Sequence, residues 1–318
     1  MHEELKGWLE WLGIDDLILH PLHGDASARR YYRLETGETE GMVMDASDMK
    51  ESVPVFIGVA WRLMDTKIRI PTIKSYELNK GFIFLEDIGS VHLFDKHTQA
   101  NAAEYYEKAI RVLVAMQNTP SQGLAPYDEM FLLEEMNLMP QWYLKEYLHQ
   151  TLECVEARML LESFSLICKE VLSQPQGIFV HRDYHAKNLM IDTQGEIVVI
   201  DFQDAKEGAL MYDLVSLLRD VYVELDAKEV QRLVLMFRDL KGLEVDDKTF
   251  MRWFDFTGLQ RHIKILGIFA RLSIRDGKDG YLKDIPLTLQ YIEEVGSKYP
   301  ELHGLLHLLK TKKRRLSV

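Results

Sequence analysis

The sequence predicts an α+β protein of two unequal parts, a small β-rich N-terminal part and a large, mainly helical C-terminal part. Three observations predict this class. The chain has 318 residues, more than one small core requires. Short apolar runs of β-forming residues, separated by turn residues, occupy positions 17–85. From Asn101 onward the apolar residues recur at helical spacing almost everywhere.

The N-terminal part is expected to begin with a helix, because its apolar residues fit one helical face: Leu5, Trp8, Leu9 and Leu12. The elements expected after it are a helix at 53–64 and extended runs at 17–20, 31–36, 41–45, 68–76 and 81–85. The last run ends in the polar stretch EDIGS, where we place the domain boundary. The predicted domains are 1–88 and 89–318.

The C-terminal part is expected to be helical at 102–117, 130–149, 155–172, 211–222, 228–240, 248–272 and 287–298. The exception is a β-hairpin near its start, because two β-rich runs, 189–192 and 196–200, are separated by a three-residue turn. Folding the chain at Gln194/Gly195 would bring Asn188 and Asp201 side by side.

The composition is that of a soluble globular protein, with 47% hydrophobic and 28% charged residues, which excludes a mostly disordered chain. No apolar run approaches a membrane span, and the N-terminus does not resemble a secretory signal. A formal net charge of −12 would repel a polyanion, so no nucleic-acid partner is expected despite the basic stretch Lys310–Arg315. Two cysteines, Cys154 and Cys168, are too few for a disulfide framework and favour a cytoplasmic protein.

The polar residues around the hairpin indicate a chemical site. The loop His181–Lys187 should bring Asp183 to the same end of the hairpin as Asn188 and Asp201. Hard oxygen ligands with open positions suit Mg²⁺ bound through phosphates, and a carboxylate that the metal does not need can deprotonate a hydroxyl. This is the pattern of phosphoryl transfer. The alternative, a surface hairpin with polar ends, does not explain why His, Asp, Asn and Asp occur together.

The stretches HRDYHAKN and IDFQDA resemble the catalytic loop and metal-binding Asp of the protein kinase superfamily. The second histidine, His185, makes the loop more similar to those of aminoglycoside phosphotransferases and choline kinases. Within that group the chain looks most like the bacterial anomeric kinases of N-acetylmuramate and N-acetylglucosamine in cell-wall recycling. The similar segments run through most of the chain: GDASARRYYRL, FLEDIG, QWYL, YDLVSLLRD, LQRHIKILGIFARL and RDGKDGYLKDIP.

The resemblance implies a two-lobed, protein-kinase-like fold with ATP and Mg²⁺ as cofactors. It makes Asp183 the catalytic base and makes Asn188 and Asp201 the ligands of Mg²⁺. It makes His181, His185 and Asp213 supports of the catalytic loop, Asp213 through backbone N–H groups. Asp213 could equally be a helix N-terminal charge favoured by the helix dipole.

The resemblance also implies where the nucleotide binds. The phosphates would lie under the turn that contains Gly24, Asp25, Ser27, Arg29 and Arg30. The adenine would meet the strand end at Leu85, Glu86 and Asp87. Residues 1–88 would then form the nucleotide-binding lobe, and residues 89–318 the catalytic and substrate-binding lobe.

One departure from the protein kinase pattern concerns the phosphate-binding lysine. Val43, Met44 and Asp45 stand where that pattern has its V-A-I-K strand, so an acid replaces the expected cation. We hypothesise that Arg29 or Arg30 supplies the cation, since a guanidinium can clamp a phosphate. The alternative is that both arginines are solvated surface charges.

On the acceptor side, the candidate residues are Trp142, Tyr143, Arg261, Arg271 and Arg275. Core packing is the alternative for the aromatic residues, whereas arginines would favour a carboxylate-bearing sugar. The predicted function is ATP-dependent phosphorylation of a small sugar at its anomeric hydroxyl. A kinase of another small alcohol, such as an aminoglycoside or a choline-like compound, and a non-catalytic nucleotide-binding regulator remain alternatives. The sequence leaves the oligomeric state open.

Overall fold

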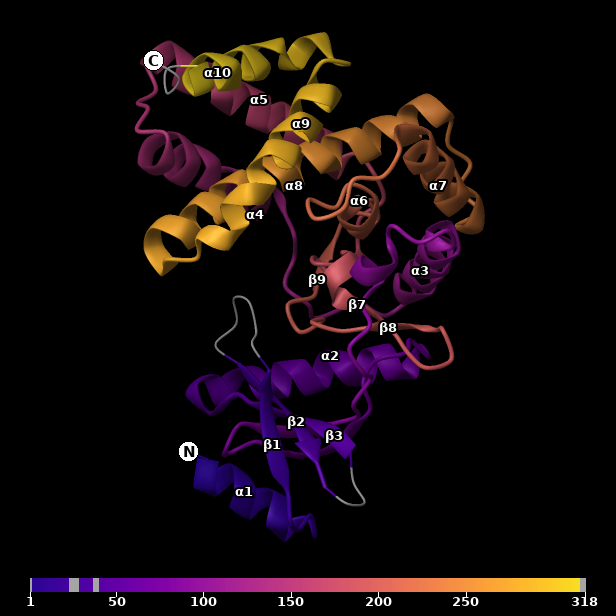
Figure 1. Ribbon diagram of the computed structural model, residues 1–318. Coiled ribbons are helices and arrows are strands. Elements are labelled where there is room, and N and C mark those ends of the chain that lie inside the picture. Colours follow the sequence, from indigo (N-terminus) through magenta and orange to yellow (C-terminus); the bar gives the residue numbers. More distant parts are fainter. Residues whose placement is uncertain (1, 23–28, 37–39, 315–318) are drawn as a thin grey trace. The chain divides into compact units, whose positions relative to one another are not determined.

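A computed structural model describes residues 2–22, 29–36 and 40–314 (Figure 1). The chain forms two compact units. Unit 1 contains residues 1–96 and 187–204, and unit 2 contains residues 97–186 and 205–318. The predicted class is confirmed, because unit 1 carries a five-stranded sheet and unit 2 is mainly helical. The predicted domains 1–88 and 89–318 differ from these units, because the prediction assigned the β-hairpin at 189–200 to the C-terminal domain. The functional division into these two domains stays a prediction.

The sheet of unit 1 is antiparallel, in the order β1-β2-β3-β5-β4. Its strands are β1 (Ile18–Leu22), β2 (Arg30–Glu35), β3 (Glu40–Asp45), β4 (Ile73–Glu77) and β5 (Phe82–Leu85). Four of the five expected extended runs are therefore confirmed, and the run expected at 68–76 is a strand only from Ile73 onward. Gly41 shows why β3 and β5 can lie close together, since a Cβ at this position would come within 2.2 Å of the Phe84 ring.

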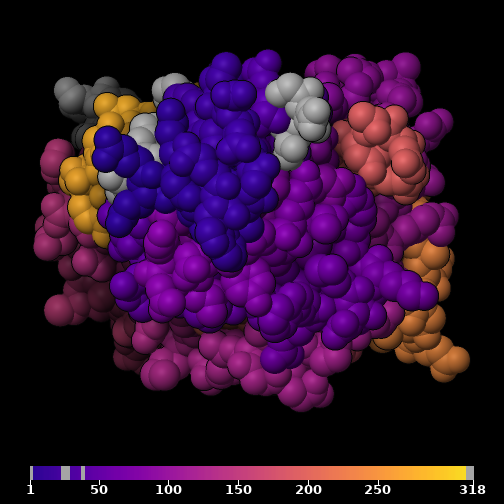
Figure 2. Space-filling model, turned by 90° about the horizontal axis from the view of Figure 1, so that it is seen from below, coloured from indigo at the N-terminus to yellow at the C-terminus, as the bar shows by residue number. Residues whose placement is uncertain are grey.

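Two helices cover the sheet of unit 1 on opposite faces (Figure 1). Helix α1 (His2–Trp11) buries Leu5, Trp8 and Leu9 against sheet residues such as Val43 and Phe84, as its apolar spacing predicts. Figure 2 views this unit from the side of α1, whose indigo segment lies at the surface. Helix α2 (Val53–Asp65), which follows the 3₁₀ segment η1 (Ser47–Ser52), covers the other face.

The hairpin of β7 (Leu189–Ile191) and β8 (Ile197–Val199) belongs to unit 1. Its strands are tied to the N-terminal chain, since the Val199 amide donates to the Arg69 carbonyl at 2.9 Å. Two 3₁₀ segments flank these contacts, η2 (Leu93–Lys96) and η4 (Ala186–Asn188). The hairpin is therefore part of the N-terminal fold although it lies about 100 residues further along the sequence.

Unit 2 is built around the long helix α8 (Asp247–Asp276), which contacts α4, α5, α6, α7, α9 and η3 (Figure 1). The other helices are α3 (Ala102–Met116), α4 (Glu129–Met136), α5 (Cys154–Leu172), α6 (Tyr212–Leu218), α7 (Ala227–Leu240), α9 (Ile285–Gly296) and α10 (His303–Arg314). Two short strands, β6 (Ile178–Val180) and β9 (Lys206–Gly208), pair antiparallel. The short segments η5 (Asp279–Asp284) and η6 (Pro300–Leu302) complete the unit. None of the helices in the described residues is long and apolar enough to cross a bilayer.

Three expected helices of unit 2 have bounds that differ from the observed ones by more than two residues. The single helix expected at 130–149 is instead α4 followed by the π-helix η3 (Met139–Tyr147), because Pro140 has no N–H to continue the α-helical hydrogen bonds. Helix α6 ends at Leu218, earlier than the expected 222. Helix α8 runs four residues past the expected 272, to Asp276, and Gly277 caps it with a φ of 65°, the left-handed conformation that glycine favours.

Candidate active site

The loop that follows β6 in unit 2 carries the predicted base and is fixed at both ends by buried carboxylates. Asp213, in the first turn of α6, accepts hydrogen bonds from the backbone N–H groups of His181 at 2.7 Å and Arg182 at 2.9 Å. Asp220, just beyond α6, accepts one from the Ala186 N–H at 2.9 Å. These are the backbone contacts that the family resemblance implied for Asp213. Asp220 was not singled out from the sequence, although it lies in the quoted stretch YDLVSLLRD.

Arg182 shows how tightly this loop is held. Its φ is 79°, a left-handed conformation that costs a non-glycine residue about 1–3 kcal/mol. The hydrogen bond from its N–H to Asp213 helps to offset that cost. Burial raises the pKa of Asp213 to about 6, although His181 and the two backbone donors oppose the increase.

Asp183 lies in the middle of this loop with its side chain 45% exposed. Its backbone N–H donates to Nδ1 of His181 at 3.3 Å, and its Oδ1 lies 3.8 Å from a terminal nitrogen of Arg261. The protein around the Asp183 carboxylate removes part of its hydration, which alone would raise its pKa. The charges of Lys264, His185, Arg261 and Arg182 outweigh this effect and lower the pKa of Asp183 to about 2. Asp183 is therefore an ionised acceptor at neutral pH.

A buried polar cluster lies beside this loop and was not foreseen from the sequence. Glu135 on α4 accepts hydrogen bonds through Oε1 from Arg182 at 2.8 Å and pairs with the ammonium of Lys264 at 2.9 Å. Tyr127 donates its hydroxyl proton to the other oxygen of Glu135, and its hydroxyl oxygen lies 2.7 Å from the Tyr212 hydroxyl, from which it can accept a hydrogen bond. The only sequence signals for this cluster are an acid in the apolar run FLLEEM and a lysine in HIKILGIFA.

The two histidines of the loop make aromatic contacts within unit 2. The His181 ring is fully buried and packs edge-on against Tyr184 at a centroid distance of 5.8 Å. The His185 ring packs edge-on against Tyr222 at 5.3 Å. Both rings therefore pack against tyrosines, and the support role of these histidines stays a prediction.

The predicted metal ligands Asn188 and Asp201 lie side by side in unit 1. The Asn188 amide nitrogen donates to Oδ2 of Asp201 at 3.4 Å. The expected pairing differs by one residue, because Leu189 faces Val199 and the Ile200 N–H donates to the Asn188 carbonyl at 3.1 Å. The cause is the three-residue turn, in which the Gly195 N–H donates to the Asp192 carbonyl and Gly195 adopts a φ of 77°. Asp201 still reaches Asn188, and its φ of 62° lies in the left-handed region.

This pair fits a magnesium ion that shares its coordination with phosphates. Mg²⁺ is commonly held by one or two protein oxygen ligands plus substrate phosphates and water, and here an amide and a carboxylate stand together. Gln203 donates to Oδ1 of Asp201 at 2.8 Å and so orients the carboxylate. Within the described residues no group of three or more His, Cys, Asp or Glu residues is arranged to hold a metal by itself.

The predicted phosphate-binding turn is described only in part. Gly24, Asp25 and Ser27 lie outside the described residues. Arg30 faces Asp45 across β2 and β3, and its guanidinium binds Asp45 at 3.3 Å and Asp48 at 3.0 Å. The unexpected acid of the sequence is therefore buried and paired with an arginine.

Arg29 and Asp201 both act on the pKa of Tyr31. Burial and the carboxylate of Asp201 raise the pKa of Tyr31 to about 12, while Arg29 opposes that increase. Arg29, Tyr31 and Asp201 therefore share one region of unit 1.

The strand end expected to meet adenine is held by side-chain ion pairs. Leu85 is buried in β5. Arg69 binds both oxygens of Glu86, at 2.5 and 2.8 Å, and these hydrogen bonds lower the pKa of Glu86 to about 2 against the effect of burial. Arg33 binds Asp87 at 2.6 Å. The side chains of Glu86 and Asp87 thus stabilise the strand end itself.

The candidate acceptor residues fall into two groups. Tyr143 on η3 is 3% exposed and stacks on Tyr147, and Trp142 packs partly buried against the core. These contacts favour the packing alternative, and an acceptor contact of either residue stays a prediction. Arg261 is 4% exposed, donates through Nε to the Ser216 hydroxyl at 2.7 Å and faces Asp183.

The two later arginines of α8 lie further from Asp183. Arg271 and Arg275 are ten and fourteen residues beyond Arg261, which is about 15 and 21 Å along the helix at 1.5 Å per residue. Arg275 pairs with Asp276 at 2.7 Å. Nε of Arg271 is buried without a hydrogen-bond partner. Burial, with the neighbouring charge of Arg275, lowers the pKa of Arg271.

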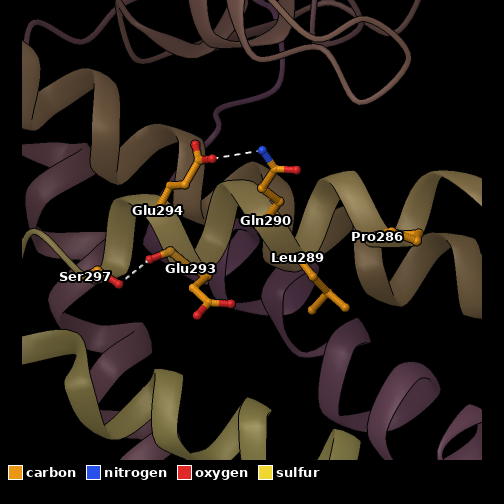
Figure 3. Close-up of a pocket in the computed structure, with 6 residues that line it drawn as sticks. All are labelled: Pro286, Leu289, Gln290, Glu293, Glu294 and Ser297. Carbon is orange, nitrogen blue, oxygen red and sulfur yellow. Dashed lines mark hydrogen bonds between the residues drawn. The ribbon is translucent and has the colours of Figure 1, made fainter.

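A separate shallow hollow lies along α9 (Figure 3). It is lined by Pro286, Leu289, Gln290, Glu293, Glu294 and Ser297. Two of its side chains are bonded within the helix, Gln290 to Glu294 at 2.9 Å and Ser297 to the Glu293 carbonyl at 2.6 Å. None of the predicted site residues lines this hollow.

Comparisons with known proteins agree in family and fold. Residues 18–254 match the model of the phosphotransferase enzyme family. The chain is 36% identical to an N-acetylmuramate/N-acetylglucosamine kinase of Pseudomonas aeruginosa, over 96% of this chain and 90% of that protein. A kinase of the same name from Neisseria meningitidis is also 36% identical, over 96% and 94% of the two chains.

Among solved structures, the choline kinase LicA of Streptococcus pneumoniae superposes with a TM-score of 0.66 at 13% identity, covering 92% of this chain and 99% of that one. A spectinomycin phosphotransferase in complex with ADP and spectinomycin superposes with a TM-score of 0.61 at 16% identity, covering 91% and 93%. At these identities the likeness concerns the fold, and it confirms the predicted protein-kinase-like architecture.

Proposed function

The chain belongs to the phosphotransferase enzyme family, and from this premise we propose that it transfers the γ-phosphoryl group of ATP to the anomeric hydroxyl of an amino sugar. N-acetylmuramate and N-acetylglucosamine are the proposed acceptors, because the relatives at 36% identity carry those names. The observation that carries the proposal is the Asp183 loop, in which an ionised carboxylate is held between two buried anchoring acids.

Asp183 is the proposed catalytic base. Its carboxylate accepts a hydrogen bond from the sugar hydroxyl and so points the oxygen at the γ-phosphorus. As the new oxygen–phosphorus bond forms, the bond from the γ-phosphorus to the bridging oxygen breaks, ADP leaves, and the hydroxyl proton passes to Asp183. Because its pKa of about 2 makes Asp183 a weak base, its main contribution before the transition state is orientation.

Asn188 and Asp201 are the proposed ligands of Mg²⁺, which would supply positive charge against the phosphate oxygens when bound. Gln203 keeps the Asp201 carboxylate oriented for that role. The support for this assignment is the adjacency of one amide and one carboxylate, a donor set that suits a hard cation sharing its coordination with phosphates.

For the nucleotide, the proposed phosphate-covering turn contains Gly24, Asp25, Ser27 and Arg29. Arg29 is the better candidate for the missing cation, because Arg30 already balances two acids whereas Arg29 shares the region of Asp201. The backbone of Leu85–Asp87 remains the proposed adenine contact.

On the acceptor side, Arg261 is the strongest of the proposed contacts, because it faces the predicted base. Arg271 is a second, since its Nε is buried without a partner. The cations around Asp183 would repel a quaternary ammonium or a polycationic aminoglycoside, which favours a neutral or anionic sugar.

Both cysteines are unpaired, which supports a cytoplasmic location.

ADP release in a coupled assay tests the proposal. The panel contains N-acetylmuramate, N-acetylglucosamine, choline, ethanolamine and several aminoglycosides, each with ATP and Mg²⁺. Turnover is expected with the two amino sugars and not with the cationic alcohols. Turnover only on choline or an aminoglycoside would show that the proposed acceptor is wrong. If none of the compounds causes ADP release, the regulator alternative is favoured.

A further inference from the structure

Lys264 is a lysine in the interior of unit 2, with 6% of its surface exposed. Lysine is almost never buried unless it is paired, because removing its ammonium from water is costly. Its Nζ contacts Oε1 of Glu135 at 2.9 Å and donates to the Tyr212 hydroxyl at 3.0 Å. Burial would lower the pKa of Lys264, but Tyr212 and Glu135 outweigh it and the pKa lies above its ordinary value. The ammonium is therefore charged where it lies.

One carboxylate serves two cations in this cluster. The oxygen of Glu135 that contacts Lys264 also binds the guanidinium of Arg182 at 2.8 Å. Arg182 directly precedes Asp183, and its backbone N–H is held by Asp213. Lys264 is thus linked to the predicted base through Glu135 and Arg182.

The charges around the base come from three elements of unit 2. Arg182, His181 and His185 belong to its own loop, Arg261 and Lys264 lie one turn apart on α8, and Asp213 lies at the start of α6. Two of these cations, Arg182 and Lys264, bind the single carboxylate of Glu135, and the third, Arg261, faces Asp183 itself. The charge of Asp183 helps to balance the remaining positive charge.

We propose that Lys264 is a positioning residue for Asp183. Through Glu135 and Arg182 its ammonium fixes the loop that presents the carboxylate, and its charge keeps that carboxylate ionised when an acceptor covers it. A bound sugar removes water from Asp183, which by itself would favour the neutral acid. The Lys264 charge opposes this protonation of Asp183. The hydroxyl of the sugar therefore meets a carboxylate that can accept its hydrogen bond, and not a protonated acid. This role rests on the proposed function of Asp183 as base.

The decisive variants are Lys264→Met, which keeps most of the side-chain volume and removes the charge, and Lys264→Arg, which keeps the charge. Lys264→Met should lower kcat by about 100-fold, as expected for a misplaced catalytic group, with little change in the KM for ATP. The kcat of Lys264→Met should also fall as the pH is lowered toward about 4, because without the lysine charge the pKa of Asp183 returns toward the ordinary value of an aspartate. This fall is the acid limb of the pH profile. Lys264→Arg should restore most of kcat and remove that limb.

Lys312 provides a matched control. It is also a buried lysine, 1% exposed, with Nζ bound to Glu156 at 2.6 Å and to the Thr151 carbonyl at 3.0 Å. Lys312→Met should lower the melting temperature as Lys264→Met does, while kcat and its pH profile stay as in the wild type. If Lys264→Met shows only this same loss of stability, the positioning role is wrong.

Two further measurements keep the inference testable. Should Lys264→Met not fold, Lys264→Gln removes the same charge, can still donate a hydrogen bond to Glu135, and should show the same acid limb. Should the wild type have no turnover with any acceptor, the proposed function fails, but ¹³C NMR titration of the Asp183 carboxyl, assigned with Asp183→Asn, still compares the wild type with Lys264→Met. An unchanged Asp183 pKa in that titration would overturn the inference.

Discussion

Gly267 sets how closely α8 approaches the start of the π-helix η3. A Cβ at this position would lie 2.3 Å from the carbonyl carbon and 2.6 Å from the carbonyl oxygen of Leu138. These are backbone atoms, which cannot rotate away as the end of a side chain can. Gly267→Ala should therefore push α8 away from η3. Arg261 and Lys264 lie within two turns of this contact, so kcat should fall as well.

The size of the effect follows from two opposing contributions. Alanine gains about 1 kcal/mol over glycine in a helix interior. Overpacking a filled interior typically costs about 1–3 kcal/mol, and occasionally more. Because the clash at 2.3 Å is with backbone, the cost should lie at or above the top of that range. We expect Gly267→Ala to lower the free energy of unfolding of unit 2 by about 2 kcal/mol.

Gly258 on the same helix is the control. A Cβ there would meet nothing closer than a nitrogen of Arg219 at 3.4 Å, which is ordinary contact. Gly258→Ala should be neutral or stabilise by up to about 1 kcal/mol. The measurement is urea unfolding of both variants, followed by circular dichroism, together with kcat. If both variants unfold at the same urea concentration, the close approach at Gly267 does not constrain α8 and the reasoning is refuted.

Three further predictions concern the ionised groups. The pKa of Glu86, lowered to about 2 from 4.5, gives stability that is present above pH 4.5 and is lost as the pH falls from 4.5 through about 2. Arg69→Met should therefore cost about 1–2 kcal/mol at pH 7 and little near pH 2 in urea unfolding. The pKa of Asp213, raised to about 6 from 3.8, gives stability that is present below pH 3.8 and lost as the pH rises through 6. In Asp213→Asn this pH-dependent loss, about 2–3 kcal/mol of the free energy of unfolding between pH 4 and 7, should disappear. The kcat of Asp213→Asn should still fall, because an amide has one acceptor oxygen for the two N–H donors of His181 and Arg182. Asp201→Asn should raise the Mg²⁺ concentration for half-maximal turnover at least about 10-fold, measured by metal titration.

The parts of the fold that the sequence predicts are those governed by local periodicity. The runs of β-forming residues at 31–35 and 41–45, bounded by turn residues, predict β2 and β3, and the spacing of Leu5, Trp8 and Leu9 predicts the buried face of α1. The turn before Gly195 predicts the hairpin but not its pairing, because the register depends on whether two or three residues close the turn.

Residues that act through distant contacts are harder to predict. Glu135 and Lys264 lie 129 positions apart and meet only because α4 and α8 pack together. A charged residue inside an apolar helical run indicates burial or a partner, but it does not identify that partner. Asp220 resembles an ordinary helix-end acid until its bond to the Ala186 N–H is seen. The family resemblance supplied Asp213, since a motif preserves contacts that periodicity does not encode.

The most direct measurement of the central claim is phosphoryl transfer to N-acetylmuramate by Asp183→Asn, followed by ³¹P NMR of the product. The matched control is Asp246→Asn, which keeps a good N-cap for α8, where Asp246 accepts the Thr249 N–H at 3.0 Å. Wild type and Asp246→Asn should both form a sugar phosphate at the anomeric position, while Asp183→Asn should be slower by about 100-fold or more. Equal rates for the wild type and Asp183→Asn would contradict the account.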